Sequence, residues 1–204
     1  MTETGEDVDL QEELGQIKQA MGLQEAYPYW WHFWIVEGLA VGVVFPIMQL
    51  GFREGFRPWI IALTVGVLIA YEVVLWRMIS TYERPTTGVP SWRTWHIILF
   101  GGMGTLIVGT GPYVDAIEFA QLMPLWLVLV GTLIGVAYLY LGQLLSAYNI
   151  RDADCYAFFL GGFWSLILVA TIPYVPAARG WEFAVFGVGY AVYCLSAYAV
   201  LSKV

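Results

Sequence analysis

Six long apolar runs, almost free of charge, constrain this chain more than any other feature of its sequence. An α-helix of about 20 apolar residues crosses the hydrocarbon core of a bilayer with its backbone polar groups satisfied internally. Short segments carrying charges and turn-forming residues separate the runs. We therefore predict an all-α, polytopic membrane protein with six transmembrane helices. The predicted spans are 29–50, 58–80, 95–112, 121–148, 156–175 and 182–203.

Composition and net charge limit the kinds of partner that the chain can bind. The chain is 59% hydrophobic and 12% charged, about half the usual 25% charged residues of a soluble domain. Its net charge of −7 argues against a nucleic-acid partner and against a docking patch for anionic lipid headgroups. The expected partner is the lipid bilayer itself. Scarce lysine, acidic polar segments and abundant Gly, Val and Ala resemble the composition of membrane proteins from salt-loving archaea.

The N-terminal segment is polar and has two predicted parts. Residues 1–9 are acidic and are predicted to be a disordered tail. Residues 10–24 are predicted to form a short amphipathic helix on the cytoplasmic side, because Leu10, Leu14 and Ile17 recur at helical spacing. This helix either lies against the ends of the bundle or forms a coiled-coil contact in a homo-oligomer or membrane complex.

Lysine and arginine residues predict the orientation. Cytoplasmic segments carry an excess of these two residue types. Six lie on the side of the N-terminus and three on the opposite side, which predicts a multi-pass protein of the cell membrane with both termini in the cytoplasm. The first set is Lys18, Arg77, Arg84, Arg93, Arg151 and Lys203, and the second is Arg53, Arg57 and Arg179.

The transmembrane region, residues 29–203, contains an internal repeat. Trp31-His32 recurs as Trp95-His96, and Pro112-Tyr113-Val114 recurs as Pro173-Tyr174-Val175. These matches occur in the same order along the chain, and each copy enters the membrane from the same side. The pattern predicts three parallel helical hairpins related by an axis along the membrane normal. Their ranges are 29–80, 95–148 and 156–203.

Glycine spacing supports close helix packing and carries a family resemblance. The first helix of each hairpin runs through glycines to a proline, and the clearest example is 38–46. Small residues permit close helix approach in lipid. Three hairpins of this kind resemble the short repeat of the HdeD-like membrane proteins, which in bacteria are associated with acid resistance. The resemblance implies a six-helix fold over about 29–203, and it implies no particular functional residues.

Two carboxylates inside predicted spans are the main candidates for function, because intramembrane charges are expensive. Glu37 and Glu72 both lie roughly 12 Å from the cytoplasmic surface at 1.5 Å per residue. As members of one hairpin they could meet and share a proton. With His32, Arg77 and His96 they could line a path for protons or cations. The alternative is that each glutamate bonds to a neighbouring hydroxyl or to Arg77 and fastens the hairpin.

Other chemistry has weaker support in the sequence. Haem ligation by His32 and His96 is one alternative, and snorkelling of both histidines beside tryptophan is the other, so we expect no cofactor. Neither Cys155 nor Cys194 belongs to a CxxC pair, and no protease, hydrolase or P-loop motif occurs. We therefore expect a non-enzymatic structural or accessory membrane component, with a small proton or cation channel or transporter as the alternative.

Overall fold

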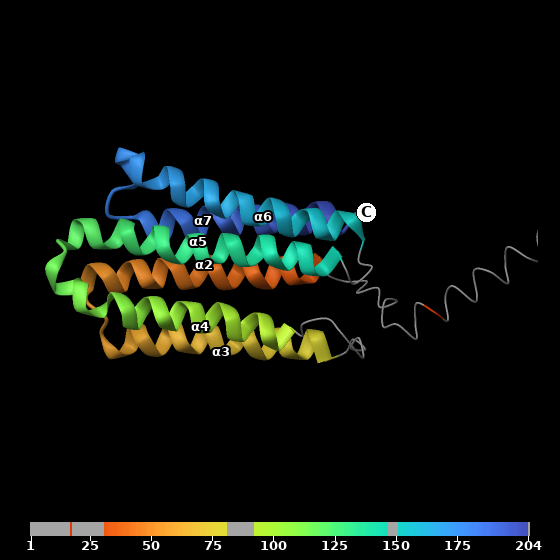
Figure 1. The fold of residues 1–204 in the computed structure, drawn as a ribbon, viewed down its shortest axis with the longest axis horizontal. Helices are drawn as coiled ribbons and strands as arrows, with labels where there is room; N and C mark the ends of the chain where they lie inside the picture. The colour runs from red at the N-terminus through yellow and green to blue at the C-terminus, as the bar shows by residue number, and fades with distance from the viewer. Residues whose placement is uncertain (1–16, 18–30, 81–91, 147–150, 204) are drawn as a thin grey trace, which may run out of the picture.

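Six long helices form the described part of the chain (Figure 1). The computed structural model describes Ile17 and residues 31–80, 92–146 and 151–203. All six helices are long and apolar enough to cross a membrane, which confirms the predicted spans with ends shifted by a few residues. They are α2 (Trp31–Glu54), α3 (Pro58–Ser80), α4 (Trp92–Thr110), α5 (Phe119–Ser146), α6 (Asp152–Thr171) and α7 (Glu182–Leu201).

Parts of the sequence-based prediction lie outside the described residues. The acidic tail at 1–9 is not described, and Ile17 is the one described residue, a helical one, of the predicted amphipathic helix at 10–24. Consecutive helices do pack on each other as pairs, α2 on α3, α4 on α5 and α6 on α7. The relation of the three pairs as a repeat stays a prediction.

Glycine and proline determine where the helices end. Gly55 adopts φ 81° in the turn between α2 and α3, a left-handed conformation that glycine adopts without strain. Pro112 and Pro173 stand in the 3₁₀ turns that follow α4 and α6, where their missing N–H groups interrupt the helical ladder. Pro46, by contrast, lies inside α2, which continues to Glu54. The first hairpin therefore departs from the pattern in which proline ends the first helix.

The core lies among α2, α5, α6 and α7. The closest packing is of α2 on α7 and of α5 on α6, both between different hairpins. Glycines permit these approaches: a Cβ on Gly38 would lie 2.7 Å from Cβ of Cys194, and one on Gly131 would lie 2.1 Å from Val169 Cγ1. Large aromatic side chains fill the remaining space. The fully buried aromatic residues include Phe33, Trp34, Tyr138, Phe158, Phe183, Phe186 and Tyr190.

A buried amide ties the core together at one end. The Gln49 side chain donates from Nε2 to the carbonyl oxygen of Gly180 at 2.8 Å and to Sδ of Met123 at 3.1 Å. Its Oε1 accepts from the backbone N–H of Phe183 at 3.0 Å, at the start of α7. First-turn N–H groups have no partner within their own helix, so Gln49 caps α7 while joining α2 to α5.

The helices α3 and α4 form an outlying layer of the bundle. Helix α3 packs on α2 and α4 packs on α5, so neither reaches the α6–α7 side (Figure 1). Only 11% of the α3 span and 6% of the α4 span is buried, against at least 28% in each of the other four spans. Most of the surface of these two helices is therefore open to lipid or to other membrane helices.

Candidate functional site: an intramembrane carboxylate beside a cavity

Glu37 lies in the interior of the bundle. Its side chain is only 6% exposed, and one carboxylate oxygen accepts a hydrogen bond from the hydroxyl of Tyr71 at 2.5 Å. The tight turn at 55–57 places α2 and α3 side by side, which brings these two residues together. The hydrogen bond thus fastens α2 to α3 within the apolar part of the bundle.

Tyr138 approaches the same carboxylate from α5. It is 1% exposed and lies within electrostatic range of Glu37 and of Tyr190 on α7. Its hydroxyl nevertheless has no partner with hydrogen-bond geometry among the described residues, and neither has that of Tyr190. An unpaired buried hydroxyl costs about 1–3 kcal/mol. The buried hydroxyl of Tyr138 therefore lies near Glu37 and interacts with it electrostatically.

Glu72 has a different partner. Its Oε1 lies 3.1 Å from Nε2 of His96, so this contact joins α3 to α4. The Glu72 side chain is 41% exposed while that of His96 is 12% exposed, and the contact is an ion pair when His96 is protonated. Glu72 also acts electrostatically on Glu37. The structure therefore brings Glu37, Glu72 and His96 into one region, with each carboxylate holding its own partner.

The other two predicted site residues lie nearer the end of the bundle. His32 is exposed and stacks on Trp31, with ring centroids 3.4 Å apart, while Trp31 packs on Tyr198 of α7. Arg77 is exposed close to the end of α3. His32 thus stacks on a neighbour in its own helix whereas His96 contacts Glu72 of α3, and haem ligation by the two histidines stays an untested alternative. Among the described residues, no group of three or more His, Cys, Asp or Glu is placed to hold a metal.

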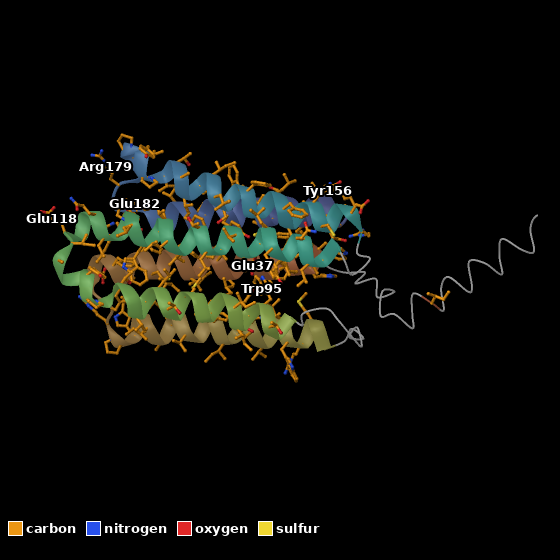
Figure 2. All side chains as sticks on the ribbon, in the orientation of Figure 1. Glu37, Trp95, Glu118, Tyr156, Arg179 and Glu182 are labelled. Atoms are coloured by element: carbon orange, nitrogen blue, oxygen red, sulfur yellow. The ribbon has the colours of Figure 1, made fainter. Side chains whose placement is uncertain are left out.

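A cavity of about 170 Å³ lies between the α2–α3 hairpin and the α4–α5 hairpin. In the described parts of these helices, α3 makes few close backbone contacts with α4, and α2 makes few with α5. Side chains line the space instead. Glu37 and Trp95, labelled in Figure 2, both line it. The aromatic lining residues are Phe45, Tyr71, Trp95, Phe100, Trp126 and Tyr138.

The described helices form a bundle of the multi-pass membrane type, with the buried carboxylate of Glu37 at a cavity between two hairpins. No protein-family model, curated protein or solved structure matches the chain. The resemblance to HdeD-like proteins therefore stays a prediction, and the function has to be argued from the geometry.

Sequence reasoning missed three polar residues that matter here: Gln49, Tyr71 and Tyr138. Each lies in a largely apolar predicted span, where a neutral polar side chain resembles an ordinary packing residue. One signal was available, because Tyr71 directly precedes Glu72 in the predicted second span. Adjacent side chains on a helix point about 100° apart, so Tyr71 and Glu72 were expected to face different neighbouring helices.

Proposed function

We propose that this protein is a non-enzymatic structural or accessory component of the cell membrane that assembles with further membrane helices through α3 and α4. The observation that carries the proposal is the contrast between the two parts of the bundle. Helices α2, α5, α6 and α7 bury much of their apolar surface against one another, while α3 and α4 leave nearly all of theirs uncovered. The partner is a second copy of the chain or another membrane protein.

Glycine positions support an interface on this layer. In α2, α5, α6 and α7 each glycine has a neighbouring side chain or backbone within 4 Å of an added Cβ. By contrast, Gly66 on α3 and Gly101 and Gly104 on α4 have nothing within that distance. Gly66 also continues an exposed stripe with Ala62 and Ala70, spaced by four residues. Helices in lipid associate through small residues that allow close approach.

Cysteine cross-linking tests the assembly. We expect Gly66→Cys, oxidised with copper phenanthroline in native-lipid particles, to form a disulfide-linked dimer when a second copy is the partner. When the partner is another membrane protein, we expect a thiol- and amine-reactive cross-linker at the same cysteine to give a mixed product. The natural cysteines, Cys155 and Cys194, are both buried and stay in place. Leu160→Cys is the matched control, because Leu160 is 60% exposed on the opposite layer. Equal cross-linking at both positions, or none at Gly66→Cys, contradicts the proposal.

The proposed orientation places both termini in the cytoplasm. Support comes from the positive residues, which are more frequent on the side where α2 begins and α7 ends. Cysteine introduced at exposed Lys203 is expected to react with a membrane-impermeant maleimide only after cells are opened. Labelling in intact cells would reverse the orientation.

A second candidate is the movement of protons or cations through the carboxylate region. It is favoured by the half-exposed Glu72 beside His96, within electrostatic reach of buried Glu37. Such an arrangement offers successive sites from the bundle surface inward. Proton, sodium and potassium flux into proteoliposomes tests it, with the Glu37→Gln/Glu72→Gln double variant as comparison. Flux in the native chain that the folded double variant lacks supports this candidate, and flux equal to empty liposomes excludes it.

A further inference from the structure

Among the described residues, no ion pair includes Glu37, and the hydrogen bond that its carboxylate accepts from Tyr71 comes from a neutral hydroxyl. A carboxylate buried in a low-dielectric interior is costly unless it is paired with a cation or protonated. Glu37 lines the cavity, so a cation bound there would lie beside its carboxylate.

The cavity walls suit the body of such a cation. Six aromatic side chains contribute to the lining, and aromatic faces attract organic cations through their quadrupoles. The titratable lining residues are Glu37, Tyr71, His96 and Tyr138, and most other lining residues are aliphatic or aromatic. An apolar cavity of about 150 Å³ holds benzene in an engineered protein. The 170 Å³ here therefore accommodates one aromatic ring or a short branched alkyl group.

We propose that the cavity between the α2–α3 and α4–α5 hairpins binds a small lipophilic organic cation, with its charged head at Glu37 and its apolar body against the aromatic walls. Tyr71 holds the carboxylate in position by donating to it. The unpartnered hydroxyl of Tyr138 turns its oxygen toward the positive head. This binding role goes beyond the assembly role and does not depend on it.

The route into the cavity follows from the arrangement of the outlying helices. Where they are described, α3 and α4 have few close backbone contacts, and the Glu72–His96 contact links them near the polar end. A lipophilic cation dissolved in the bilayer therefore enters between α3 and α4. A permanently hydrated metal ion has no such route, and the largely apolar lining offers it few oxygen ligands.

Equilibrium binding of N-methylpyridinium, a cation of one aromatic ring, to the full chain in phosphatidylcholine nanodiscs tests the proposal, with empty nanodiscs subtracted. Toluene is the matched neutral compound, because it has the same shape without the charge. We expect saturable binding of the cation and no competition by the neutral compound at equal concentration. Glu37→Gln is expected to weaken binding about ten- to a hundredfold, as loss of a charge-assisted contact does.

Two further variants make the result specific. Glu182→Gln is the matched control, since Glu182 is also buried, at 4% exposure, but lies at the far end of the bundle (Figure 2), so binding should be unchanged. Val130→Phe fills the cavity from α5 and should abolish binding while keeping Glu37. If Glu37→Gln fails to fold, Val130→Phe decides the question.

Three results would overturn the proposal. The first is no saturable binding of the cation to the native chain. The second is competition by toluene at equal concentration, which would make the cavity an apolar site for a neutral molecule or a lipid chain. The third is unchanged cation binding in a folded Glu37→Gln or Val130→Phe variant.

Discussion

Replacing Tyr71 with phenylalanine removes one hydroxyl and keeps the ring, so it isolates the hydrogen bond that joins α3 to α2. That hydroxyl donates to Glu37 at 2.5 Å, and Glu37 is 6% exposed. Side-chain hydrogen bonds within membrane proteins average about 0.6 kcal/mol and reach about 1.7 kcal/mol. Bonds to charged groups lie at about 1.5–3 kcal/mol in soluble proteins. We expect Tyr71→Phe to lower the free energy of unfolding by about 1–2 kcal/mol.

The measurement is reversible unfolding in mixed micelles, titrated with a denaturing detergent and followed by circular dichroism. Tyr140→Phe is the matched control, because Tyr140 is 47% exposed and no hydrogen bond of its hydroxyl is found in the described structure. A double-mutant cycle with Glu37→Leu, which removes the acceptor, isolates the pair, and we expect a coupling energy near 1 kcal/mol. A Tyr71→Phe effect equal to that of Tyr140→Phe, or a coupling energy of zero, would refute the view that Glu37 fastens the hairpin.

Two other stability predictions follow from the same packing. Gln49→Leu removes the cap of α7 and leaves the Phe183 N–H buried without its partner, so we expect a loss of about 1–3 kcal/mol in the same titration, and an unchanged midpoint would contradict the capping role. Gly131→Ala forces a Cβ to 2.1 Å from Val169 and should cost about 1–3 kcal/mol, whereas Gly66→Ala meets nothing within 4 Å and should cost nothing in detergent. Equal effects at both glycines would show that α5 and α6 can separate freely.

The spans were predictable because hydropathy is a local property. Each helix needs its own run of apolar residues to cross the hydrocarbon core of the bilayer. The length and composition of that run therefore locate the helix in the sequence without knowledge of its neighbours. The sequence allowed two interpretations of Glu37, a proton or cation path and a hydrogen bond that fastens the first hairpin. The second describes its contact with α3 in the structure. Its partner, Tyr71, was not identified, because a lone tyrosine in an apolar helix resembles any aromatic packing residue.

The arrangement of the helices was not predictable from the chain. Helices that are apolar all round carry no stripe that shows which face is buried. Nothing in the sequence therefore showed that Glu37 is buried whereas Glu72 is 41% exposed. The close packing of α2 on α7 joins residues from opposite ends of the transmembrane region, as in the contact between Gly38 and Cys194. Pairings of this kind depend on tertiary fit rather than on local pattern.

Assembly through α3 and α4 is the central claim, and native mass spectrometry of the chain ejected from native-membrane nanodiscs tests it most directly. The account predicts a complex heavier than one 22.9 kDa chain, which Gly66→Leu returns to the mass of a single chain while the helical content stays native. A single 22.9 kDa chain in the native sample, or a complex that Gly66→Leu leaves intact, would contradict it.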